Sequence, residues 1–167
     1  MELCVARRDS GPVELTADMQ RVVAEQQLGF VATVTPDGRP NLSPKGTTAV
    51  WDDHHLMFAD VSSPGTIANL AANPWVEINV VDPIVRSGYR FQGRATVHTE
   101  GPGYEQGLTL MAARGSSLGR DAVRAIVVVD VTGADAVWSP AYARGLTAAD
   151  LAPRWLAHHR ALHPEAG

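Results

Sequence analysis

The sequence predicts a mainly β protein of the α+β class: an antiparallel barrel, closed or nearly closed, with helices that plug or flank it. Two observations support this fold class. About six strand-like runs follow one another in hairpin order, and few helical stretches lie between them. Strong turn signals, above all Pro36-Asp37-Gly38, separate neighbouring runs.

The first half of the chain is expected to form a helix, a three-stranded meander and a second helix. Thr16 suits the N-cap of the first helix, and Ser63 followed by Pro64 suits the start of the second. The paired histidines His54 and His55 lie in a turn, and nothing nearby supplies the further ligands that a metal site needs. The expected elements are a helix over residues 17–27, strands over 30–35, 40–50 and 56–60, and a helix over 62–73.

The second half alternates strands and helices. Gly101-Pro102-Gly103 is expected to break a long strand, and Thr147 with Asp150 resembles a capping box before the last helix. The expected elements are strands over 75–81, 89–100 and 125–131, an extension of the sheet over 136–138, and helices over 104–117 and 148–162.

The totals limit the number of domains and the class of function. The chain has 167 residues, of which 45% are hydrophobic and 19% are charged, as in ordinary globular domains. We expect a single domain over residues 16–162, with loose ends at 1–15 and 163–167. The net charge of −4 disfavours a nucleic-acid partner, because phosphate backbones require a basic surface.

The expected location is cytoplasmic. The single cysteine, Cys4, excludes an intramolecular disulfide and a cysteine metal cluster, which is typical of a reducing compartment. No apolar run approaches the ~20 residues that span a bilayer, so no membrane partner is expected. No apolar segment follows Arg7 and Arg8 as it would in a signal peptide.

Two polar clusters predict an anion pocket. The first is N-L-S-P-K-G-T at 41–47, and the second is S-S-P-G-T at 62–66, where a helix is expected to begin. A helix N-terminus presents unpaired N–H groups, and here it also carries hydroxyls at Ser62, Ser63 and Thr66. The helix face that Thr66 shares with Asn69 can point toward the strand of Lys45. Lysine, amides and hydroxyls together suit a phosphate. On spacing alone a simpler interpretation remains open, in which Ser63 is only a cap and Lys45 is only a surface lysine.

Four motifs, in this order, resemble the pyridoxamine 5′-phosphate oxidase-like, FMN-binding split-barrel superfamily, and a fifth, later motif resembles its small-protein branch. The resemblance covers roughly residues 16–160, and its motifs are jointly more specific than any one of them. They are F-V-A-T-V-T-P-D-G-R-P-N-L-S-P-K-G-T, L-M-F-A-D, T-I-A-N-L-A-A-N-P-W-V-E-I-N-V, G-Y-R-F-Q-G-R-A and W-S-P-A-Y.

The resemblance implies a six-stranded antiparallel split barrel that forms a homodimer, with FMN at the subunit interface. It singles out no catalytic residue and no metal ligand, although Tyr89 and Arg90 are candidates for positioning a substrate. The cofactor-binding residues that it implies are Ser43, Pro44, Lys45, Gly46, Thr47, Ala59, Asp60, Ser62, Ser63, Thr66 and Asn69, with Gly88, Tyr89 and Arg90 supplied by the other subunit.

The implied activity is that of an oxidoreductase. The flavin would carry a hydride or electrons from a reduced carrier to a small planar substrate. Many relatives carry an arginine, then a lysine or threonine, where this chain has Gly65 and Thr66. The lost charge-assisted contact is worth roughly 1.5–3 kcal/mol. FMN would then bind weakly, or another ligand would be preferred, unless Lys45 or Arg90 compensates.

Two alternatives on the same fold stay open. One is a reductase that uses the deazaflavin F420, and the other is a non-catalytic flavin or haem carrier, with His98 as the haem ligand. The C-terminal third does not match the oxidase's own contacts to pyridoxal phosphate, so vitamin B6 oxidation is not predicted.

Overall fold

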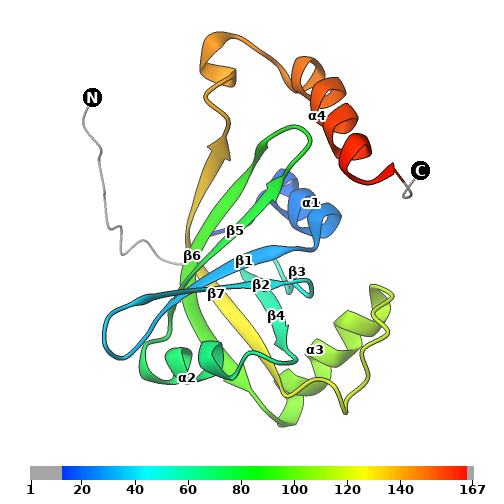
Figure 1. The fold of residues 1–167 in the computed structure, drawn as a ribbon. Coiled ribbons are helices and arrows are strands. Elements are labelled where there is room, and N and C mark those ends of the chain that lie inside the picture. Colours follow the sequence, from blue (N-terminus) through cyan, green and yellow to red (C-terminus); the bar gives the residue numbers. More distant parts are fainter. Residues whose placement is uncertain (1–12, 165–167) are drawn as a thin grey trace.

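The computed structural model describes residues 13–164; Cys4 and the outermost residues of both expected loose ends lie outside this range. An antiparallel sheet curls into a half-barrel with helices around it, as the sequence predicts (Figure 1). The strands are β1 (Gly29–Val34), β2 (Pro40–Lys45), β3 (Ala49–Val50), β4 (His55–Asp60), β5 (Trp75–Asp82), β6 (Ser87–His98) and β7 (Ala125–Trp138). The helices are α1 (Ala17–Gln26), α2 (Pro64–Ala72), α3 (Gly101–Ala113) and α4 (Ala148–Leu162), with a 3-10 turn at Tyr142–Arg144.

The described sheet has seven strands, so the expected count of six was wrong. The single strand expected over 40–50 divides into β2 and β3, because residues 46 and 47 turn the chain and the Thr48 hydroxyl donates to the Lys45 carbonyl at 2.9 Å. The strand order is β2-β1-β5-β6-β7-β4-β3. The two edge strands are therefore consecutive in the chain, and the short turn between them draws the edges of the sheet together.

The longest strands stand at the centre of the sheet. β6 has 12 residues; it pairs over Ser87–Arg94 with β5 on one side and along its whole length with the 14-residue β7 on the other. β7 is continuous and includes the extension expected over 136–138. The β6–β7 register shifts between Gln92 and Gly93, and such a bulge bends and twists a strand pair as a curled sheet requires.

The core lies on both faces of β4. Leu56 and Phe58 belong to the larger cluster inside the half-barrel, and Met57 and Ala59 belong to a second cluster on the opposite face, with Tyr104 and Met111 of α3. Because both faces are covered, β4 reads as an unbroken apolar run. Leu15, which the sequence assigned to the loose segment 1–15, is 3% exposed and packs in the larger cluster.

The helices begin close to where their capping residues predict. The Thr16 hydroxyl accepts the Met19 amide, and Thr147 with Asp150 forms the predicted capping box of α4. α3 begins at Gly101, three residues before its expected start, because Gly101-Pro102-Gly103 forms its first turn instead of a break. Among residues 13–164, no helix has the length and apolar character needed to cross a membrane.

Candidate cofactor-binding site

The inward face of β2 is polar. Asn41, Ser43 and Lys45 are buried or half-buried, whereas the alternate residues Pro40, Leu42 and Pro44 are exposed. Side chains alternate between the faces of a strand, so the three polar residues form a single row. Pro44 therefore points away from the other predicted cofactor-binding residues.

Hydrogen bonds connect this row to α2. The Ser43 and Ser63 hydroxyl oxygens lie 3.5 Å apart. Asn69 is 4% exposed and donates from Nδ2 to the Thr33 hydroxyl of β1 at 3.0 Å, and Thr33 donates in turn to Asn41 Oδ1 at 3.5 Å. These contacts fix α2 against the β1–β2 hairpin, with the polar row between them.

Lys45 is buried, and the alternative of a surface lysine is wrong. Its exposed fraction is 5%, and its Nζ lies 5.8 Å from the centre of the Phe58 ring. Burial lowers the pKa of the Lys45 ammonium below its ordinary value, and the Asp60 carboxylate opposes this shift. Lys45 forms no ion pair with any residue between 13 and 164, so Asp60 acts on its charge without a direct contact.

Ser63 starts α2 in a different way from the prediction. Its side chain makes no capping hydrogen bond. Instead, its amide donates to Asp60 Oδ1 at 2.7 Å, and its carbonyl accepts the Thr66 amide at 3.0 Å. The Ser63 hydroxyl is thereby turned toward Ser43. Beside it, a Cβ added at Gly65 would meet no atom within 4 Å, so the first turn of α2 borders open space.

Thr47 attaches the turn after β2 to the end of β4. Its hydroxyl accepts the Ala59 amide at 2.9 Å. Gly46 and Ser62 are exposed at the margin of the same region. We call the following residues, which the fold brings together, the β2–α2 cluster: Ser43, Lys45, Thr47, Ala59, Asp60, Ser63, Thr66 and Asn69. That they bind a cofactor stays a prediction.

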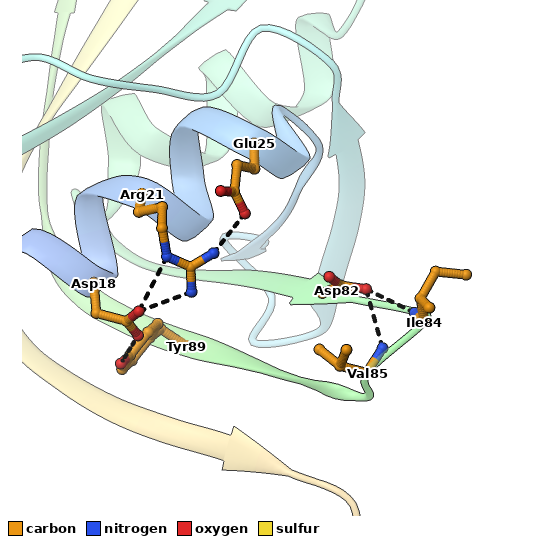
Figure 2. A network of polar contacts seen from close by, with 7 residues as sticks. All are labelled: Asp18, Arg21, Glu25, Asp82, Ile84, Val85 and Tyr89. Atoms are coloured by element: carbon orange, nitrogen blue, oxygen red, sulfur yellow. Dashed lines mark hydrogen bonds and ion pairs between the residues drawn. The ribbon is translucent and has the colours of Figure 1, made fainter. Parts of the chain in front are cut away.

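The predicted residues Gly88, Tyr89 and Arg90 make their contacts elsewhere in the chain. Figure 2 shows Tyr89 of β6 pointing at Asp18 of α1, and its hydroxyl donates to Asp18 Oδ2 at 2.6 Å. Arg90 pairs with Asp135 of β7 at 3.2 Å. A Cβ on Gly88 would lie 2.1 Å from the Val80 carbonyl oxygen, so close packing of β5 on β6 explains this glycine.

The Asp18 carboxylate is the centre of an exposed polar network. It also pairs with Arg21, which in turn pairs with Glu25 at 2.6 Å (Figure 2). Hydrogen bonds from Tyr89 and Arg21 lower the pKa of Asp18 below its ordinary value. The network joins α1 to β6, and the hydrogen bonds and ion pairs that form it include no residue of the β2–α2 cluster.

Sequence reasoning missed Arg114. A pocket of about 260 Å³ lies between the turn after β2, at Gly46 to Thr48, and the end of α3, at Arg114 and Ser116. Burial lowers the pKa of Arg114 below its ordinary value. An arginine at a helix C-cap is normally read as a capping residue, and only the fold reveals that it faces the Gly46–Thr48 turn.

The histidines do not converge. Within residues 13–164, no group of three or more His, Cys, Asp or Glu side chains is placed to hold a metal ion. His55 Nδ1 lies 2.7 Å from Asp52 Oδ1 within their shared turn. The His98 ring packs against Gly103, where an added Cβ would lie 2.8 Å from the ring. This contact gives His98 a packing role at the start of α3.

The half-barrel and the β2–α2 cluster define a split-barrel protein with a candidate anion pocket. The family model of pyridoxamine 5′-phosphate oxidase matches residues 15–138, and the chain belongs to this family. No curated protein matches the chain.

Solved structures agree with this assignment. HupZ from Group A Streptococcus is 31% identical with a TM-score of 0.66, and the match covers 74% of this chain and 94% of that chain. An F420 reductase is 26% identical with a TM-score of 0.57, over 72% of this chain and 98% of the other. An FMN-binding protein from Syntrophomonas wolfei subsp. wolfei shares the fold at 14% identity, with a TM-score of 0.60 over 73% of this chain and 86% of the other.

Proposed function

We propose that the chain is an FMN-dependent oxidoreductase whose β2–α2 cluster holds the phosphate of the flavin. The observation that carries the proposal is the buried ammonium of Lys45, which has no ion-pair partner between residues 13 and 164. A buried charge is costly unless it is paired, and a phosphate would supply the direct ion-pair partner that Asp60 does not. A bound flavin supplies the redox chemistry, and the protein supplies binding, orientation and electrostatics.

The polar groups around Lys45 suit a phosphate. The first turn of α2 leaves amides without intrahelical acceptors, and the open space beside Gly65 gives an anion room to approach them. The Ser43 and Ser63 hydroxyls, 3.5 Å apart, can both donate to one oxyanion. The Asp60 carboxylate repels an anion, but it accepts the Ser63 amide and so shapes the turn in which Ser63 lies.

We also propose that two copies associate through the outer face of the β1–β2 hairpin. The cross-strand pairs toward the hairpin turn are Ala32 with Leu42 and Val34 with Pro40. Leu42 is 64% exposed and Val34 is 39% exposed. An exposed apolar face of this kind is typical of a protein interface. In such a dimer the segment 88–90 of the second copy covers the flavin ring, as the family resemblance implies.

An F420-dependent reductase is the second candidate. The likeness to an F420 reductase at 26% identity, over 98% of that protein, favours it. The net charge of −4 weighs against it, because the longer acidic tail of F420 suits an added basic rim, and this places it second to FMN. The mass of the cofactor distinguishes the two candidates, since F420 carries a longer acidic tail than FMN.

The proposal is tested on the purified protein in three measurements. Its visible absorbance reports a bound flavin, the mass of the compound released by heat identifies it, and light scattering gives the oligomeric state. We expect FMN in a dimer, and anaerobic bleaching of the flavin by NADH or NADPH. Release of F420 would replace FMN with the second candidate. A colourless monomer that binds neither compound when it is added would refute the proposed function.

A further inference from the structure

A groove lies on the far side of β1 from the β2–α2 cluster. It has a volume of about 550 Å³ and runs between α4, the tip of the β5–β6 hairpin and the start of β1. Figure 1 shows α4 beyond the tip of this hairpin. Its apolar lining includes Leu28, Phe30, Val81 and Pro83. The volume lies within the range of small-molecule sites, and no residue of the cluster lines the groove.

Arg86 is held rigidly at one side of this groove. It has a left-handed backbone with φ of 59°, which is uncommon outside glycine. Its amide donates to the Asp82 carbonyl at 2.8 Å, and its carbonyl accepts the Ser139 amide at 2.9 Å. Asp82 also accepts the amides of Ile84 and Val85 (Figure 2). The hairpin tip is thus closed on itself and attached to the segment that leads to α4.

The Arg86 guanidinium stacks on Trp155 of α4. Its central carbon lies 4.2 Å from the centre of the indole ring. Stacking uses the face of the guanidinium and leaves the N–H donors at its edge. Among residues 13–164, Arg86 forms no ion pair. Its edge is therefore available to an anionic group in the groove.

The ionisable side chains that line this groove are all basic. The ionisable residues that line it are Arg86, His158 and His159, and no described Asp or Glu lines it. The chain as a whole has a net charge of −4, so a groove lined by basic groups alone departs from the average surface. His158 also meets Trp155 edge-to-face at 5.5 Å, and the two rings form an aromatic wall above the apolar floor.

We propose that this groove binds a planar aromatic anion: its ring lies between the Phe30 floor and the Trp155 wall, and its carboxylate or phosphate accepts hydrogen bonds from Arg86. The match to the family model ends at Trp138, so α4 and its wall of the groove lie outside the matched residues. The site is separate from the proposed flavin site, and its ligand binds whether or not a flavin is present.

The test is calorimetric titration of the full chain with naphthoate and with its neutral amide, both with and without saturating FMN. We expect naphthoate to bind at least about tenfold more tightly than the amide, because a charge-assisted hydrogen bond is lost with the charge. Arg86→Gln should remove this difference. Arg154→Gln is the matched control, because Arg154 also stacks on Trp155, at 5.7 Å, but does not line the groove; it should change the affinity by less than about twofold.

A second measurement makes the test independent of the Arg86 variant. In a proton–nitrogen NMR spectrum, the indole signal of Trp155, assigned by its loss in Trp155→Phe, should shift on titration with naphthoate. Equal affinity for acid and amide, equal losses in Arg86→Gln and Arg154→Gln, an unchanged Trp155 signal, or competition with FMN would each overturn the proposal.

Discussion

Gly65→Arg tests whether the first turn of α2 binds the flavin phosphate. The substitution restores the cation that many relatives carry. It is sterically free, because an added Cβ meets no atom within 4 Å, and Gly65 is exposed. If the arginine reaches the phosphate, one charge-assisted contact contributes roughly 1.5–3 kcal/mol, which lowers the Kd for FMN by about ten- to a hundredfold.

The stability of the ligand-free protein should change little. An arginine in the first turn of a helix opposes the helix dipole by about 0.3–1 kcal/mol. Replacing a helical glycine recovers about 0.8–1 kcal/mol of helix propensity. The two effects nearly cancel, so thermal unfolding of the variant without FMN should stay within a few degrees of the parent protein.

The assay is a titration of FMN followed by quenching of flavin fluorescence. Gly119→Arg is the matched control, because an added Cβ there also meets no atom within 4 Å and Gly119 is exposed outside the β2–α2 cluster. The two variants have the same net charge, so any difference between them is local. If Gly65→Arg binds FMN no more tightly than Gly119→Arg, the phosphate does not lie at this turn.

Three further substitutions test other parts of the structure. Lys45→Met should weaken FMN binding at least about tenfold. Because burial lowers the pKa of Lys45 in the folded state, the unfolding free energy of the parent should rise relative to that of this variant as the pH approaches the ordinary lysine pKa of about 10.4. Parallel pH profiles of the two unfolding free energies would contradict this. Tyr89→Phe should lower the free energy of urea unfolding by about 0.5–1 kcal/mol at neutral pH. This loss should shrink as the pH falls through the lowered pKa of Asp18, because the protonated carboxyl no longer offers a charged acceptor to Tyr89. A loss that is constant with pH would assign the effect to packing. Gly88→Ala should lower the unfolding free energy by about 1–3 kcal/mol, because the added Cβ meets the backbone of β5. Gly133→Ala should lower it by less, because the Cβ added there meets only a flexible side chain. Equal losses in the two variants would refute the packing explanation.

Local chemistry predicted most of the elements. The threonine caps at Thr16 and Thr147 located two helices, and α4 has the bounds that its capping box predicts. Errors arose where a local signal had two outcomes. Gly101-Pro102-Gly103 can break a strand or begin a helix, and only packing of α3 on β7 decides between them. The β2–β3 turn lies within a stretch that reads as continuous strand, and the division follows from pairing with opposite edges of the sheet.

The candidate site was predictable in part. The alternation of Asn41, Ser43 and Lys45 along β2 and the hydroxyls before α2 could be read from the sequence, and the fold brings them together. The burial of Lys45 could not be read, because a lysine in an alternating strand suits a solvent face equally well. Arg114 was missed because it is far from the turn after β2 in the chain and meets it only through the packing of α3.

The most direct test of the proposed phosphate site compares FMN with riboflavin, which has the same ring system and no phosphate. If the β2–α2 cluster holds the phosphate, the parent protein should bind FMN at least about tenfold more tightly than riboflavin. Lys45→Met should bring the two affinities together by weakening FMN alone. Equal affinities of the parent protein for the two flavins would contradict the site, even if a flavin binds elsewhere.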